Sequence, residues 1–243
     1  MVRTGHFYFA NTKKISFFLD KDKKVKYYFV GWPTNDLRKR KKMRRSLKKG
    51  IKTHKIINRR SEIYQKALEL FIKKGYDATS LAMIAKRLGM SKANLYYYCP
   101  SKEGLLYQIH LDDLQRRFIP IVAEAEKISD PEDRLTFFLR KFALMCTSSP
   151  ASRVLIHEIH CLKRSHYNEI TAIWKRAYKL IQGSIKELQQ CGKARKFRES
   201  FLTFLGTGMV FWIVYWFDYN RQSTAEELSN TLTQVFLHGL LVK

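Results

Sequence analysis

The side chains between residues 91 and 98 have the types and spacing needed to contact a nucleic acid. Only Leu95 and one tyrosine are needed to hold a helix of this length against its neighbours. Three consecutive tyrosines cannot all face inward on one helix, so at least one must point outward. The alternative is an aromatic-rich helix that simply packs inside a bundle. The segment reads Ser91-Lys92-Ala93-Asn94-Leu95-Tyr96-Tyr97-Tyr98.

The outward side chains match the chemistry of DNA, whose major groove admits a helix and displays donors, acceptors and thymine methyl groups. Lys92 can reach a phosphate or a guanine, Ala93 permits close approach, and Asn94 can pair with a base edge. The hydroxyls of Tyr96 and Tyr97 can donate to backbone phosphates. We therefore expect nucleic-acid binding by this helix.

Apolar spacing predicts two further short helices before this segment. Apolar residues recur at helical intervals over 63–71 and again over 81–88. Gly75 and Gly89 are typical of the residues that end such helices. Ser91 can then cap the next helix, because its hydroxyl satisfies free amide groups at the helix start. A short helix, a glycine turn and a second short helix make a helix-turn-helix.

A fourth helix is expected directly after Pro100, with Ser101 as its cap. Lys102 lies in the first turn of this helix, where free amide groups already favour an anion. We therefore expect Lys102 to contact a phosphate. Its replacement by alanine should lower the slope of log affinity against log salt concentration by about 1.

The segments that carry a family resemblance are Ala67–Phe71, Gly75–Ser80, Ile84–Ala85, Leu88–Lys92, Leu95–Tyr97 and Ser101–Leu106. On these segments, residues 58–117 resemble the DNA-binding domain of TetR/AcrR-family transcriptional regulators. Two positions depart from the common pattern: Tyr98 stands where His or Tyr is usual, and Cys99 replaces the common Phe. The smaller Cys99 bears on the rigidity of the domain rather than on DNA binding.

The resemblance implies a helix-turn-helix over about 80–99 and a homodimer whose recognition helices meet successive major grooves of a palindromic operator. It also implies a ligand-responsive repressor rather than an enzyme. The DNA contacts that it implies are Thr79, Ser80, Lys92, Ala93, Asn94, Tyr96, Tyr97 and Lys102.

Residues 118–243 are expected to form a ligand-binding and dimerisation domain, so that the fold class is all-α. No strand-like alternation persists in the chain. In this family the last two helices usually form the dimer interface, and Gly206 and Gly208 would let partner helices approach closely. The helices expected after the helix-turn-helix are 102–127, 131–147, 151–160, 166–190, 196–218 and 224–241.

The C-terminal region loosely resembles regulators that respond to CoA thioesters. Such an effector needs cations for its phosphates and an apolar tunnel for its acyl group. The alternatives are a solvated charged face with a plain core, or a pocket for lipophilic cations. The cation candidates are Lys163, Arg164, Lys175, Arg176 and Lys179. The ligand-binding residues that we expect are Phe138, Phe142, Met145, Trp174, Arg176, Phe211, Trp212 and Tyr215.

The chain carries a formal net charge of +25, and residues 1–57 supply most of it. Nine of the twelve residues in Arg38–Lys49 are Lys or Arg. We expect residues 1–57 to be a flexible basic extension, either a solvated tail or an arm that adds phosphate contacts. The rival function is a nonspecific nucleic-acid- or membrane-binding protein driven by this extension.

Other classes of function have weaker support. His157, Glu158 and His160 suggest a metal cluster, but the histidines lack the i, i+4 spacing of the helical zinc motif, so no metal site is expected. Catalytic signatures, phosphate-cradling loops and dinucleotide fingerprints do not occur. Four scattered cysteines suit a reducing compartment, and neither a signal peptide nor a transmembrane helix is expected. We expect a cytoplasmic, nucleoid-associated protein.

Overall fold

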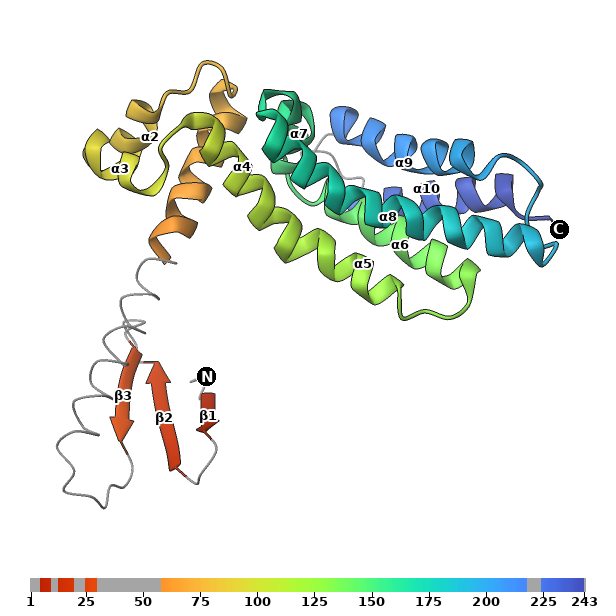
Figure 1. Ribbon diagram of the computed structural model, residues 1–243, viewed down its shortest axis with the longest axis horizontal. Coiled ribbons are helices and arrows are strands. Elements are labelled where there is room, and N and C mark those ends of the chain that lie inside the picture. Colours follow the sequence, from red (N-terminus) through yellow and green to blue (C-terminus); the bar gives the residue numbers. More distant parts are fainter. Residues whose placement is uncertain (1–4, 10–12, 20–24, 30–57, 218–223, 243) are drawn as a thin grey trace. The chain divides into compact units, whose positions relative to one another are not determined.

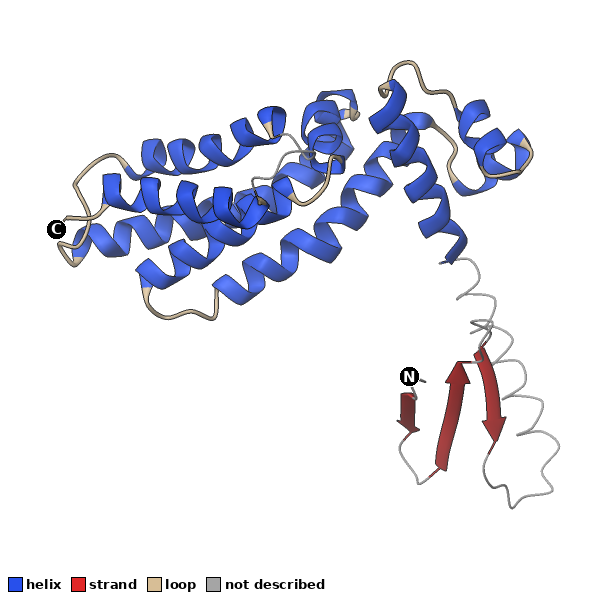
Figure 2. Ribbon diagram, turned by 180° about the vertical axis from the view of Figure 1, so that it is seen from behind, coloured by secondary structure: helices blue, strands red, loops and turns tan. Residues whose placement is uncertain are grey.

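The computed structural model describes the chain except for residues 1–4, 10–12, 20–24, 30–57, 218–223 and 243. It divides into two compact units, residues 1–56 and 57–243. Within the described residues, the second unit is built from helices, which confirms the all-α class for the part that resembles a regulator (Figure 2). The basic run Arg38–Lys49 lies outside the described residues.

The first unit contains a three-stranded antiparallel sheet in the order β1 (Gly5–Phe9), β2 (Lys13–Leu19), β3 (Val25–Phe29). The expectation that no strands occur is therefore wrong for this segment. These strands carry adjacent aromatic residues instead of strict alternation, as in Tyr27-Tyr28. Aromatic residues favour strands. The composition of this segment therefore indicates strands, although its residues do not alternate between apolar and polar.

Four helices form the amino-terminal head of the second unit. A helix over 58–74 is followed by α2 (Leu81–Arg87), α3 (Lys92–Tyr98) and α4 (Lys102–Asp113). Buried apolar side chains from all four helices pack together; they include Ile63, Ala67, Phe71, Ile84, Leu95 and Leu105.

The turns between these helices follow the expected chemistry. Gly75 and Gly89 have φ of 85° and 62°, values that a side chain with a Cβ rarely adopts. Ser91 Oγ accepts a hydrogen bond from the Asn94 amide at 3.2 Å, and Ser101 Oγ accepts one from the Gly104 amide at 2.9 Å. Both serine caps are therefore confirmed.

The helix that leaves the head continues into the bundle with one irregular turn. α4 runs into η1 (Leu114–Phe118), a π-helical turn, and then into α5 (Ile119–Ala125), as Figure 1 shows for α4 and α5. The sequence predicts this element as a single helix over 102–127, and apolar periodicity does not reveal the wide turn. Such turns occur frequently at functional sites.

The remaining helices form the bundle, close to their expected bounds. Asp130 caps α6 by accepting from the Glu132 and Asp133 amides at 2.9 Å. In the described residues, no helix is long and apolar enough to cross a membrane. The elements are α6 (Pro131–Thr147), α7 (Ala151–His157), the 3-10 helix η2 (Glu158–Cys161), α8 (Arg164–Gln190), α9 (Glu199–Trp216) and α10 (Ala225–Leu240).

Candidate DNA-binding face and effector cavity

Helix α3 presents its polar side outward. Leu95 is its one buried residue and anchors the helix to the head. Tyr97 is 79% exposed, so the expectation that a tyrosine points into solvent is confirmed. Lys92 Nζ lies 5.7 Å from the centre of the Tyr96 ring. The exposed residues of this helix are Lys92, Ala93, Asn94, Tyr96 and Tyr97.

Thr79 and Ser80 lie at the start of α2 but differ in exposure. Ser80 is exposed, and its Oγ accepts from the Met83 amide at 3.2 Å. Thr79 is 1% exposed, and its hydroxyl donates to the Gly75 carbonyl at 2.7 Å. The structure thus places Ser80 on the surface, whereas Thr79 closes the turn from within.

Lys102 braces the loop before α2. Its ammonium donates to the carbonyl oxygens of Tyr76 at 2.9 Å and Asp77 at 3.3 Å, and it lies 4.2 Å from the centre of the Tyr76 ring. An ammonium group has three N–H donors. One donor is left beyond these two carbonyls, so contact with a DNA phosphate stays a prediction.

The bundle contains an aromatic cavity of about 210 Å³ that is open to solvent on one side, where the exposed Lys175 and Phe204 lie. Four of the expected ligand-binding residues line it: Phe138, Phe142, Trp174 and Phe211. The stacked rings of Trp174 and Phe211 lie 5.3 Å apart, and Phe142 meets Phe211 edge-on at 5.6 Å. Lys175, a candidate cation for the effector, also lines the cavity. The lining residues that the sequence did not indicate as a pocket are Phe118, Ala177, Tyr178, Ile181, Phe204 and Thr207.

A partial signal for the missed residues was present on α8. Trp174, Ala177, Tyr178 and Ile181 follow the helical spacing i, i+3, i+4 and i+7, which places them on one face. That spacing marks an inward face but does not distinguish a cavity wall from a filled core. Phe118 gave no such signal, because its position depends on the wide turn η1.

A smaller cavity of about 20 Å³ adjoins the first and shares Phe118, Phe142, Trp174 and Phe211 with it. Met145, an expected ligand-binding residue, lines this smaller cavity. His110 also lines it; the residue is 2% exposed, and its Nδ1 is buried without a hydrogen-bond partner. Burial lowers the pKa of His110 to about 4, so the ring is neutral at pH 7.

The structure places three expected ligand-binding residues away from the cavities. Arg176 is exposed on α8, and its guanidinium pairs with both carboxylate oxygens of Glu126. Trp212 is 65% exposed, and Tyr215 packs edge-on to His157. Helical phase explains this for Trp212, which is one residue from Phe211 and therefore points to another side of α9. Tyr215 shares the face of Phe211 but lies one turn further along α9, where its ring meets His157. Lys175, next to Arg176, lines the cavity instead.

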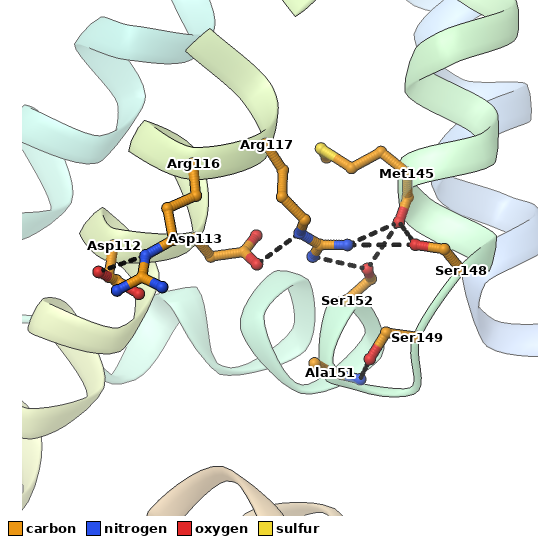
Figure 3. Close-up of polar contacts among 9 residues, drawn as sticks. All are labelled: Asp112, Asp113, Arg116, Arg117, Met145, Ser148, Ser149, Ala151 and Ser152. Atoms are coloured by element: carbon orange, nitrogen blue, oxygen red, sulfur yellow. Dashed lines mark hydrogen bonds and ion pairs between the residues drawn. The ribbon is translucent and has the colours of Figure 1, made fainter. Parts of the chain in front are cut away.

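Arg117 of η1 joins three helices at the end of the smaller cavity (Figure 3). Its Nε donates to Asp113 Oδ1 at 2.7 Å, and one terminal nitrogen donates to the Met145 carbonyl at 3.0 Å and Ser148 Oγ at 3.2 Å. The other terminal nitrogen donates to Ser152 Oγ at 3.4 Å. Burial raises the pKa of Asp113, and the Arg117 charge opposes that rise.

Helix α9 carries an exposed apolar face. It includes Phe201, Phe204, Leu205, Trp212 and Trp216, and the rings of the two tryptophans lie 5.7 Å apart. Nothing lies within 4 Å of a Cβ added at Gly208, whereas at Gly206 it would meet the Phe236 ring at 3.1 Å. Gly206 therefore packs against Phe236 of the same chain. The expectation that both glycines let a partner helix approach is wrong for Gly206.

These features define the class of protein: a helix-turn-helix head with an outward polar helix, joined to a bundle that holds an aromatic cavity. Comparison with known proteins agrees with this class. The family described as "Bacterial regulatory proteins, tetR family" matches residues 63–109, and "Tetracyclin repressor-like, C-terminal domain" matches residues 129–240.

The curated relatives match only part of this chain. QacR of Staphylococcus aureus (strain Mu50) is 45% identical over 53 residues, which is 22% of this chain and 28% of QacR. The chain spans only 15% to 44% of the lengths of QacR, of YuxN of Bacillus subtilis and of IcaR of Staphylococcus epidermidis.

Solved structures match the fold over most of this chain. AibR, in complex with isovaleryl coenzyme A and operator DNA, is 26% identical, with a TM-score of 0.66 over 73% of this chain and 97% of AibR. PfmR of Thermus thermophilus is also 26% identical, with a TM-score of 0.68 and the same coverage.

The chain belongs to the TetR family of bacterial transcriptional regulators. It is a DNA-binding transcriptional regulator, and proteins of this family are not enzymes. Proteins of the TetR family dimerise.

Proposed function

We propose that this chain is a homodimeric repressor that leaves a palindromic operator when a small hydrophobic effector, a CoA thioester, binds inside the bundle. The observation that supports this proposal best is the aromatic cavity. The cavity is lined by Phe118 of η1, and η1 lies in the helix that leaves the DNA-binding head. The head is residues 58–117, and the effector-binding and dimerisation domain is residues 118–243.

The DNA-binding part of the proposal rests on the exposed side of α3. Its surface residues Lys92, Asn94, Tyr96 and Tyr97 supply one cation and several hydrogen-bonding groups suited to phosphates and base edges. Lys102 and Ser80 flank this surface. In a dimer, two such helices would meet half-sites about 34–36 Å apart. Such a protein acts in the cytoplasm, associated with the nucleoid.

The dimer rests on the exposed face of α9. Trp212 and Trp216 are 65% and 70% exposed, which is costly for large apolar side chains at the surface of a monomer. Gly208 on the same helix leaves open space for close approach. A second copy of this face would bury these side chains.

The effector class is supported by the size and charge of the cavity. About 210 Å³ is less than the roughly 300–1,000 Å³ typical of drug-sized ligands, so the cavity suits a short or branched acyl group. Its charged lining residue is Lys175, which favours an anionic ligand over a lipophilic cation. AibR, which is similar over most of this chain, binds isovaleryl coenzyme A.

The proposed response runs through the helix from α4 to α5. Phe118 ends η1 and lines the cavity, and Lys102 begins α4 against the loop before α2. An effector that prefers one arrangement of this helix changes the fraction of heads that fit the operator. It does so only to the extent that its affinity differs between the two arrangements.

The test begins by selecting bound duplexes from a random DNA pool and measuring operator affinity by fluorescence anisotropy. We expect a palindromic site, weaker binding by Tyr97→Ala, and release by short branched acyl-CoAs but not by free CoA or cationic dyes. Deletion of residues 1–57 should weaken affinity and leave the sequence preference intact. Binding without sequence preference, or lost entirely with that deletion, would mean a nonspecific basic protein instead.

A cavity-filling variant isolates the effector site. Thr207→Phe, which adds bulk to the cavity wall, should keep operator affinity and lose release by acyl-CoA. Thr171→Phe is the matched control, because Thr171 also lies on a bundle helix and its hydroxyl donates to the carbonyl four residues earlier, but it does not line the cavity. If every acyl-CoA leaves the wild-type complex intact, the effector class is wrong and the DNA-binding function still stands.

A further inference from the structure

Three side chains with metal-binding atoms converge on η2. Cys161 Sγ lies 3.4 Å from Glu158 Oε2 and 3.5 Å from His160 Nε2. The ligand atoms of all three residues lie within 4.8 Å of one another. The tight 3-10 turn brings together residues that are adjacent or three apart in sequence, which an α-helical reading of this segment does not anticipate.

Two acceptors in this cluster, His160 and Glu158, lie beside the single thiol of Cys161. His160 Nδ1 lies 2.7 Å from the carbonyl oxygen of His157, and a carbonyl only accepts, so Nδ1 carries the ring proton. In the tautomer with its proton on Nδ1, the lone pair of His160 Nε2 faces Cys161 Sγ at 3.5 Å. The thiol of Cys161 has one proton for two acceptors, the imidazole and the carboxylate of Glu158. A bound cation would satisfy all three atoms at once.

The two separations from Cys161 Sγ match the ligand spacing around a tetrahedral ion. With a zinc–sulfur distance of about 2.3 Å and zinc–nitrogen or zinc–oxygen distances of about 2.0–2.1 Å, neighbouring ligand atoms lie about 3.5 Å apart. The two separations from Cys161 Sγ are 3.4 and 3.5 Å. The hydrogen bond from His160 to a backbone carbonyl is also the usual outer support of a metal-bound imidazole.

We propose that Glu158, His160 and Cys161 form a binding site for a divalent ion of the zinc class, with three protein ligands and an open fourth position. Mixed sulfur, nitrogen and oxygen ligands suit zinc or cobalt better than magnesium or calcium. Binding converts the Cys161 thiol to a thiolate, so one proton leaves the protein for each ion bound at neutral pH. This site differs from the expectation of no metal site, which rested on the spacing of His157 and His160.

The site borders the DNA-binding head. The backbone amide of Lys163, two residues after Cys161, donates to Glu103 Oε1 in the first turn of α4 at 3.1 Å, next to Lys102. Tyr76 supplies one of the carbonyls held by Lys102. The ion would therefore be bound beside the loop that precedes α2, apart from the aromatic cavity.

The experiment titrates the untagged full chain, kept reduced, with Co²⁺ and follows absorbance. We expect a sulfur-to-cobalt charge-transfer band in the near ultraviolet that saturates at one ion per chain and disappears when Zn²⁺ is added. Calorimetry in two buffers of different ionisation enthalpy should give about one proton released per Zn²⁺. Circular dichroism checks that each variant is folded.

Matched variants assign the band to this site. Cys161→Ser should abolish the band, and His160→Gln should weaken Co²⁺ affinity at least tenfold, whereas Cys191→Ser should change neither. Cys191 is the control because it is an exposed free cysteine at the far end of α8. Absence of the band at millimolar Co²⁺, its persistence in Cys161→Ser, or its loss in Cys191→Ser would each overturn the proposal.

Discussion

Glu103 in the first turn of α4 accepts a hydrogen bond from His166 Nδ1 of α8 at 2.7 Å. The same carboxylate oxygen accepts the backbone amide of Lys163 at 3.1 Å. Tyr107, one turn further along α4, stacks on the His166 ring with centroids 3.7 Å apart. The Glu103 carboxylate thus links the start of α8, the longest helix of the bundle, to α4, which begins in the head.

Replacement of Glu103 should loosen this junction. Glu103→Ala removes both hydrogen bonds, and partly buried bonds to a charged group contribute about 1.5–3 kcal/mol each before relaxation. We expect the free energy of unfolding to fall by about 2 kcal/mol, measured by urea denaturation. Glu124→Ala, which removes an exposed carboxylate of α5, is the control. Equal midpoints for the two variants would show that the junction contributes nothing.

Two neighbouring arginines allow a sharp comparison. Arg117→Met leaves Asp113 half-buried without its partner and breaks the bonds to α6 and α7, so the free energy of unfolding should fall by about 3 kcal/mol. Arg116→Met breaks only an exposed pair with Asp112 at 3.0 Å, which should cost less than about 1 kcal/mol. Thermal denaturation of both variants checks this order, and a larger loss in Arg116→Met would contradict it.

His110 predicts how stability depends on pH. Its folded pKa, about 4, lies below the ordinary value of 6.5, so the unfolded chain binds the extra proton between these values. Its contribution is fully present above pH 6.5 and is lost as the pH falls toward 4, a loss on the order of 3 kcal/mol.

The measurement compares urea unfolding of the wild type and His110→Phe between pH 7 and 5, above the range where most carboxylates titrate. The variant should show a flatter dependence, because the group that gains a proton on unfolding is gone. Parallel curves for the two proteins would mean that His110 is not the group responsible.

The exposed face of α9 predicts the oligomeric state. Trp212→Glu places a charge where a second chain would bury an indole, so sedimentation should show dissociation to single chains. Tyr167→Glu makes the same kind of change at an exposed aromatic residue of α8 and should leave the dimer intact. A dimer that survives Trp212→Glu at micromolar concentration would place the interface elsewhere.

The helix-turn-helix could be predicted almost completely from sequence, because its determinants are local. The serine caps at 91 and 101 and the positive φ of Gly75 and Gly89 depend on residues within one turn of each position. The start of α6 was equally predictable from Asp130-Pro131, since a cap followed by proline specifies a helix start.

The cavity could be predicted only in part, because hydrophobic spacing specifies an inward face and not the space beside it. Phe211 and Trp212 are adjacent, equally apolar and easily assigned to the same role, yet one lines the cavity and the other is exposed. The position of Phe118 depends on the wide turn η1, and the convergence of Glu158, His160 and Cys161 depends on a 3-10 turn. Neither departure from α-helical geometry leaves a mark in residue periodicity.

The wide turn η1 would let α4 act as a lever in the proposed response. The helix contains 12 residues, so its far end lies about 18 Å from η1 at a rise of about 1.5 Å per residue. A tilt of about 10° at the pivot would swing that end by about 3 Å, close to the rise of about 3.4 Å between stacked base pairs. In the proposed response, a tilt of this size would shift the DNA-binding head by about one base-pair step.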